Sequence, residues 1–107
     1  MSFAKMQEMD KSNRVRLAKI ELQDWKAEEL TIELSKNVGE LSKKVILIEK
    51  YYALTGKLPD IDAHLDYEMA DIIAQVMRLA DHYNIDLEKA FVEAREDEDK
   101  YLKSRDV

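Results

Sequence analysis

Acidic, amide and basic side chains recur at helical spacing in two stretches of the chain. In the first stretch they stand four, three and four residues apart, at Glu33, Asn37, Glu40 and Lys44. In the second stretch they are His64, Glu68, Asp71, Gln75 and His82. Because a helix turns by about 100° per residue, each set lies along one side of its helix.

Three of these acids, Glu40, Glu68 and Asp71, could meet where the two helices pack together. Carboxylates gathered in a partly dry site repel one another and lose solvation. A divalent cation relieves both costs, and carboxylate ligands without cysteine favour a hard ion, Mg²⁺ or Mn²⁺. The competing interpretation is ordinary surface charge. Asp and Glu make up 23 of the 107 residues, so chance alone yields several acid pairs at this spacing.

Other kinds of site find little support in the sequence. Cysteine is absent, which excludes disulfides, zinc thiolate sites and cysteine nucleophiles. Gly39 and Gly56 stand alone, so the chain has no glycine-rich phosphate loop. His64 and His82 lack a matched acid or thiol partner, and we interpret them as surface or boundary residues.

Four helical segments are expected to carry these residues. The first runs from Phe3 to about Leu22, with a break near Asp24, which is a candidate N-cap. The second covers Lys26 to Leu54 and ends before Gly56. Its apolar stripe alternates steps of four and three, at Leu30, Leu34, Val38, Leu41, Val45 and Ile48.

The third segment is expected to start near Asp60 or Asp62 and to end at Asn84. It is apolar over most of its circumference and should be the most buried helix. Its stripe is Leu65, Met69, Ile72, Val76, Leu79 and Tyr83, widened by Ala70, Ile73, Met77 and Ala80. The fourth segment begins with Asp86 as N-cap, and its inward-facing residues are expected to be Leu87, Ala90, Phe91 and Ala94.

The composition predicts a single all-α domain, a bundle of about four helices completed by homo-oligomerisation. Residues 1–24 would form an N-terminal helix and residues 25–107 the core. The net charge of −6 argues against nucleic acid as a partner. No apolar run approaches the length of a membrane span, and no export signal opens the chain, so no membrane association and a cytoplasmic location are expected.

Several motifs together resemble the MazG-like family of nucleotide pyrophosphohydrolases. Residues 38–41, Val-Gly-Glu-Leu, look like the end of the family's Glu-Glu-Val-Gly-Glu-Leu signature. Residues 67–73, Tyr-Glu-Met-Ala-Asp-Ile-Ile, are similar to its Glu-Leu-Ala-Asp-Val segment, and residues 78–81 and 84–90 resemble the usual continuation. The matching block covers about residues 29–90, and the common order and spacing of its motifs are more specific than either acid pair.

The resemblance implies an all-α dimer or dimer of dimers that cleaves a nucleoside or deoxynucleoside triphosphate into monophosphate and pyrophosphate. It also implies that Mg²⁺ is held by Glu-x-x-Glu on one helix and Glu-x-x-Asp on the next. Carried over by position, Glu68 and Asp71 are intact and Glu40 is present. Asn37 replaces the remaining glutamate, and Lys36 stands where many members have another acid.

The fourth segment departs from the family as well. Glu93 is followed by Ala94, where members commonly have Lys, and Glu98 occupies the position of a phosphate-binding Asn. Two phosphate contacts are therefore missing. Asn37 is a neutral ligand that lowers the affinity for Mg²⁺ and cannot accept a proton from water. Glu33, one turn earlier on the same side, is a candidate to compensate.

The sequence thus predicts a Mg²⁺-dependent nucleoside triphosphate pyrophosphohydrolase of weak or altered activity. Its predicted catalytic residues are Glu40, Glu68 and Asp71. The predicted ligands of Mg²⁺, or of Mn²⁺ in its place, are these three acids with Asn37 and, as a further ligand, Glu33. The alternatives are a non-catalytic homologue, a helical dimer that acts as an interaction or nucleotide-sensing module, and a purely structural bundle.

Overall fold

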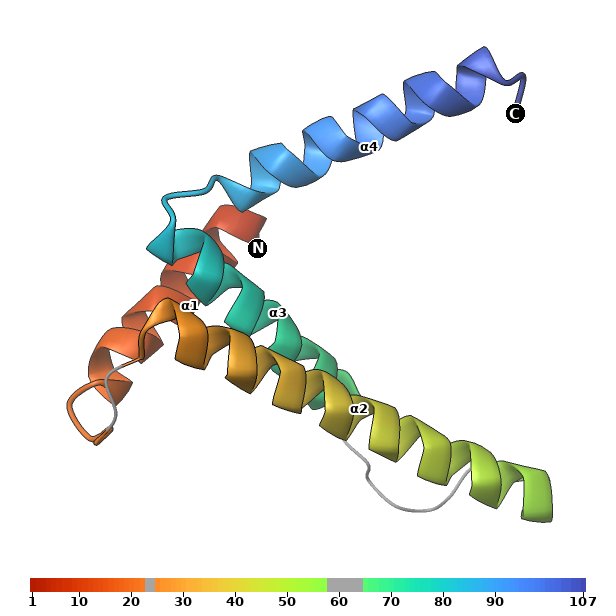
Figure 1. Ribbon diagram of the computed structural model, residues 1–107, viewed down its shortest axis with the longest axis horizontal. Helices are drawn as coiled ribbons and strands as arrows, with labels where there is room; N and C mark the ends of the chain where they lie inside the picture. The colour runs from red at the N-terminus through yellow and green to blue at the C-terminus, as the bar shows by residue number, and fades with distance from the viewer. Residues whose placement is uncertain (23–24, 58–64) are drawn as a thin grey trace. The chain divides into compact units, whose positions relative to one another are not determined.

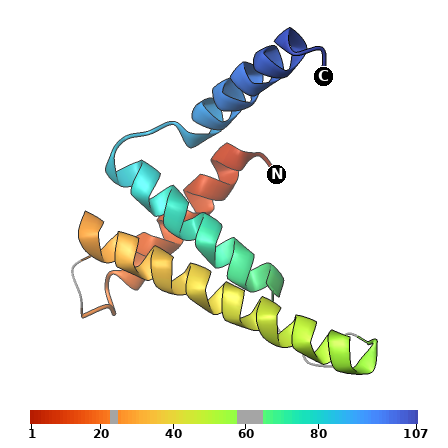
Figure 2. The same cartoon turned by 45° about the vertical axis from the view of Figure 1, so that its right-hand side comes forward.

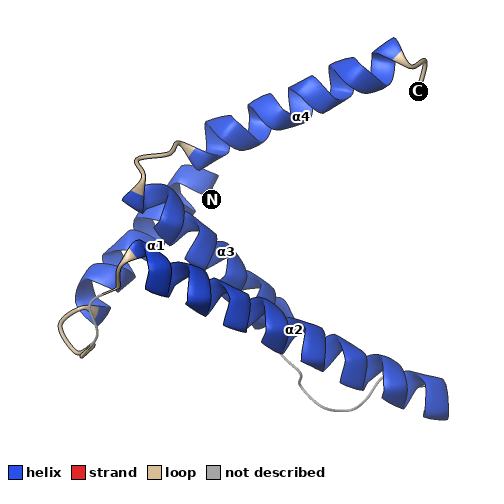
Figure 3. Ribbon diagram, viewed as in Figure 1, coloured by secondary structure: helices blue, strands red, loops and turns tan. Residues whose placement is uncertain are grey.

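The computed structural model describes residues 1–22, 25–57 and 65–107, and over these ranges the chain is helical, with no strand (Figure 3). The helices are α1 (Phe3–Leu17), α2 (Ala27–Thr55), α3 (Leu65–His82) and α4 (Leu87–Ser104). The predicted all-α class and the four helices are confirmed. None of the described helices combines the length and apolar character that a bilayer span requires.

The chain divides into two compact units, and α3 contributes to both. One unit is Gln23–Val76, which contains α2 and the first part of α3. The other combines Met1–Leu22 with Met77–Val107, and so contains α1, the end of α3 and α4.

In the unit Gln23–Val76, α3 runs back alongside α2 as the second arm of a helical hairpin (Figures 1 and 2). α2 begins one residue later than expected, with Lys26 as its N-cap, and the proposed cap Asp24 lies outside the described residues. Gly56 ends α2 as predicted. It adopts a left-handed conformation with φ of 68°, and its N–H donates to the carbonyl of Tyr52 at 2.7 Å. Asp60, Asp62 and His64 also lie outside the described residues, and α3 is described from Leu65.

In the other unit, α1 ends at Leu17, five residues before the predicted end. The N–H groups of Lys19 and Ile20 donate to carbonyls three residues earlier, which tightens the chain into a turn. The predicted end of α3 is confirmed, because Asn84 takes a left-handed conformation and the N–H of Ile85 reaches back to the carbonyl of Ala80 at 2.8 Å. Asp86 caps α4 as predicted, accepting a hydrogen bond from the N–H of Lys89 at 3.1 Å.

Few apolar side chains are fully buried among the described residues. They are Leu30 on α2 and Met77 and Ala80 on α3. The expectation that α3 is the most buried helix therefore holds for its second half. In its first half, Met69 and Ile73 are each 50% exposed. The described chain also leaves Ala90, Phe91 and Ala94 of α4 exposed, so the prediction that they face inward is wrong for the single chain, where no described segment covers them.

Candidate functional site

The side of α2 that packs on α3 differs from the predicted apolar stripe. Val38 and Val45 were expected at this contact, but they are 43% and 40% exposed. Asn37 and Lys44, one residue earlier in each case, are the less exposed positions. Within this unit the contact side of α2 alternates steps of four and three residues, at Asn37, Leu41, Lys44 and Ile48. Two polar residues thus stand within an otherwise apolar helix contact.

The facing side of α3 has the same character. In the part of α3 that belongs to this unit, the less exposed positions spaced by three and four are Leu65, Glu68, Ile72 and Gln75. The hairpin therefore contains four polar residues along its contact, two on each helix. Buried polar groups lower stability unless they find partners, so their pairing is informative.

One of these pairs is directly formed. Lys44 Nζ lies 2.5 Å from Glu68 Oε1 in an ion pair that joins the two helices. The side chain of Glu68 is 18% exposed and that of Lys44 is 35% exposed. The pair is thus partly withdrawn from water, where a charged hydrogen bond contributes more than on an open surface.

The Lys44–Glu68 pair also sets the register of the hairpin. Because the helices are antiparallel and each rises 1.5 Å per residue, a step of seven residues backward on α2 matches seven forward on α3. Asn37 therefore lies at the level of Gln75, and Glu40 lies at the level of Ile72, one residue from Asp71. The Oε1 atom of Gln75 is buried and accepts no hydrogen bond from the described residues.

The hairpin brings the predicted acids to neighbouring levels but does not gather them at one point. Glu40 and Asp71 are exposed, whereas Glu68 is held by Lys44. Glu33 pairs with Lys36 on its own helix at 3.4 Å. Across the described ranges, no three acids or histidines lie close enough together to hold a metal ion.

These residues do not fit a divalent-cation site as they are arranged here. Mg²⁺ requires several oxygen ligands around one point, and the cationic group of Lys44 already occupies Glu68, the least exposed of these carboxylates. His64 lies outside the described residues. His82 belongs to the other unit, where its ring contacts that of Tyr83 edge-on at a centroid distance of 4.8 Å.

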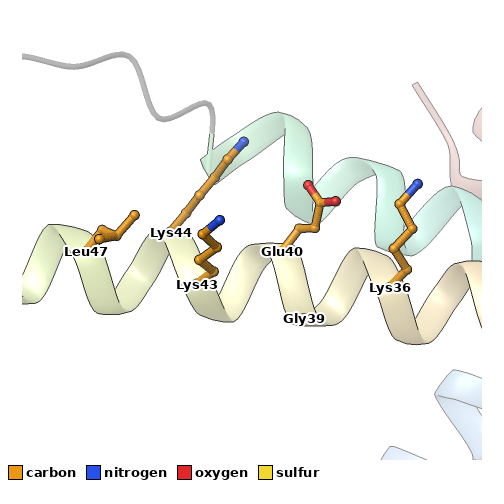
Figure 4. A pocket seen from close by; sticks show the side chains of 6 residues that line it. All are labelled: Lys36, Gly39, Glu40, Lys43, Lys44 and Leu47. Carbon is orange, nitrogen blue, oxygen red and sulfur yellow. The ribbon is translucent and has the colours of Figure 1, made fainter.

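A groove of about 490 Å³ lies on α2 beside these acids. Its lining comprises Lys36, Gly39, Glu40, Lys43, Lys44 and Leu47. Figure 4 shows the side chain of Glu40 between that of Lys36 and those of Lys43 and Lys44 along the helix. Ammonium groups in such a groove can bind phosphate oxygens through charge-assisted hydrogen bonds.

Sequence reasoning missed Lys43 and the groove as a whole. It noted Lys36 only as a departure from a family motif and Lys44 only as a member of a polar stripe. The spacing of seven and eight residues from Lys36 to Lys43 and Lys44 places all three on one side of a helix, and this signal could have identified the groove.

Glu93 and Glu98, from the stretch of α4 that departs from the family pattern at Ala94 and Glu98, lie in the other unit. Glu93 pairs with Lys89 at 3.8 Å, and Glu98 pairs with Arg95 at 3.8 Å. All four side chains are more than half exposed.

No family model, curated protein or solved structure matches the chain significantly. Its functional assignment therefore depends on its own residues and on the resemblance of its motifs.

Proposed function

We propose that the chain is a nucleoside triphosphate pyrophosphohydrolase of the MazG-like type, with weak or altered activity. The reaction would add water across the bond between the α and β phosphates and release a nucleoside monophosphate and pyrophosphate. The observation that carries the proposal is the register of the α2–α3 hairpin. It puts Glu40, from the first motif of the resemblance, within one residue of the level of Asp71, from the second, a difference of about 1.5 Å along the helix axis.

The residues of the hairpin would divide the work between binding and proton transfer. Lys36 and Lys43 are exposed beside Glu40 and would hold phosphate oxygens. Glu40 and Asp71 are exposed carboxylates that can accept a proton from an attacking water. Glu68 is engaged by Lys44, so in this arrangement it orients the hairpin rather than the substrate.

The resemblance implies Mg²⁺, and carboxylate ligands would also suit Mn²⁺. The arrangement of the acids in the described residues does not supply a site for either ion. A cation at the predicted position would compete with Lys44 for Glu68. The same competition explains why we expect activity to be weak.

The direct test is to incubate the protein with a panel of nucleoside and deoxynucleoside triphosphates, with Mg²⁺, with Mn²⁺ and with a chelator, and to measure pyrophosphate release. We expect release from at least one nucleotide and its loss in Glu40→Gln and Asp71→Ala. The Asn37→Glu variant, which adds a carboxylate able to accept a proton from water, should release pyrophosphate faster than the wild type. If neither the wild type nor Asn37→Glu released pyrophosphate from any nucleotide, the proposal would be refuted.

A second candidate function is nucleotide binding without hydrolysis, by a homologue that acts as an interaction or nucleotide-sensing module. The Lys44–Glu68 ion pair favours it, because this pair neutralises an acid that the enzyme would need for its metal. Asn37 favours it as well, since an amide cannot replace the proton-accepting carboxylate. Saturable nucleotide binding with no turnover in any metal condition would support this candidate against the enzyme. Whether the protein is an enzyme or a binding module, we expect its nucleotide-bound form to be a dimer or tetramer.

A further inference from the structure

The groove on α2 is locally basic on an acidic protein. The chain carries a net charge of −6, yet the groove is lined by three lysines and a single acid, Glu40. Positive charge concentrated in a hollow attracts anions even when the molecule as a whole repels them.

The three lysines differ in how freely they can meet a ligand. Lys43 is exposed and makes no ion pair with any residue in the described ranges. Lys36 is 60% exposed, and its 3.4 Å contact with Glu33 is a surface pair, which phosphate can displace at little cost. Lys44 is held on Glu68, and its side chain is the more exposed of the two.

Gly39 keeps the middle of the groove open. A Cβ atom built at this residue would have no neighbour within 4 Å, so open space lies above the backbone there. Glycine inside a helix costs stability relative to alanine. Gly39 lines the groove together with the three lysines, and its lack of a side chain leaves room for an anion to approach the helix.

We infer that this groove binds the phosphate chain of a triphosphate directly through Lys36, Lys43 and Lys44, without a bridging divalent cation. Lys44 supplies beside Glu68 the positive charge that a metal would otherwise bring. The inference deepens the proposed function and rests on it for the identity of the ligand, because the phosphate chain is that of the proposed substrate. It concerns binding alone and is measurable apart from turnover.

Direct binding by lysines and binding through a metal ion predict opposite changes in affinity in two experiments, the addition of Mg²⁺ and the substitution Glu40→Gln. Mg²⁺ complexes a triphosphate and lowers its charge, so added Mg²⁺ should weaken binding to lysines but strengthen binding to carboxylates. Glu40 repels an anion bound by lysines, so Glu40→Gln should tighten binding. In a metal-bridged site, Glu40→Gln would remove a ligand and weaken binding.

The experiment is calorimetric titration of the full chain with inorganic tripolyphosphate in a chelator, followed by titration in excess Mg²⁺. We expect saturable binding in the chelator that weakens with Mg²⁺ and with added salt. Lys43→Met should weaken it about five- to tenfold, the loss of one charge-assisted contact. Glu40→Gln should tighten it several-fold. Lys100→Met, the same charge change on exposed α4, is the control and should leave it unchanged.

Several results would overturn the inference. They are no binding in the chelator, binding that requires Mg²⁺, weaker binding by Glu40→Gln, or equal losses in Lys43→Met and Lys100→Met. Lys43 is exposed and makes no described ion pair, so its replacement should leave folding intact, which circular dichroism would verify.

Pyrophosphate release from nucleotides is measured in parallel. Binding of tripolyphosphate without any release would refute the proposed function alone, and release with binding only through Mg²⁺ would refute this inference alone.

Discussion

Replacement of Lys44 by Met is expected to destabilise the protein by about 1–2 kcal/mol. Exposed ion pairs contribute up to about 1 kcal/mol, whereas breaking a fully buried pair costs about 3–5 kcal/mol. The Lys44–Glu68 pair falls between these limits, because its side chains are 35% and 18% exposed. Met keeps most of the length of the apolar stem of Lys44. The loss of stability therefore reports the missing positive charge opposite Glu68 rather than a packing defect.

A double-mutant cycle with Glu68→Gln isolates the pair. Urea denaturation of the wild type, both single variants and Lys44→Met/Glu68→Gln should give a coupling energy of about 1 kcal/mol. A control cycle on Lys89 and Glu93 of α4, whose side chains are 70% and 61% exposed at 3.8 Å, should give about 0.3 kcal/mol. Additive effects of Lys44→Met and Glu68→Gln, within about 0.3 kcal/mol, would refute the reasoning that this pair joins the hairpin.

Gly39→Ala should stabilise the protein by about 0.5–1 kcal/mol, because it removes a helix-interior glycine where a Cβ meets open space; a lower melting temperature would contradict this. Asp86→Ala should cost about 1 kcal/mol through loss of the α4 cap, and Asp97→Ala in the middle of α4 should cost much less in the same thermal melts. Light scattering in dilute solution should show a dimer or tetramer, because Met69 and Ile73 leave apolar surface on α3 that a second copy would cover. Particles of only 12.5 kDa would count against this last expectation.

The helices and most of their described ends could be predicted from local sequence. Gly56 and Asn84 terminate α2 and α3 because each takes the left-handed conformation that these residue types tolerate. Asp86 starts α4 because its carboxylate accepts from the N–H of Lys89. The end of α1 at Leu17 was missed, since no glycine or proline marks the turn that follows.

The rotation of α2 about its axis could not be predicted. Asn37 and Val38 are only about 100° apart around the helix, as are Lys44 and Val45. The side with the two valines and the side with Asn37 and Lys44 therefore both match the helical spacing of four and three residues. An apolar stripe is the better choice for an isolated helix, and on that basis Val38 and Val45 were expected at the contact. The valines are instead left half-exposed.

The sequence by itself determined the helical class, the caps and the residues able to do chemistry, because each follows from a few neighbouring residues. Only the tertiary structure decided which of them meet. The antiparallel hairpin pairs Lys44 with Glu68 across 24 residues of chain, and that contact takes Glu68 out of the predicted group of metal-binding acids. A spacing along one helix specifies an angle, but the partner of a charge depends on the second helix packed against it.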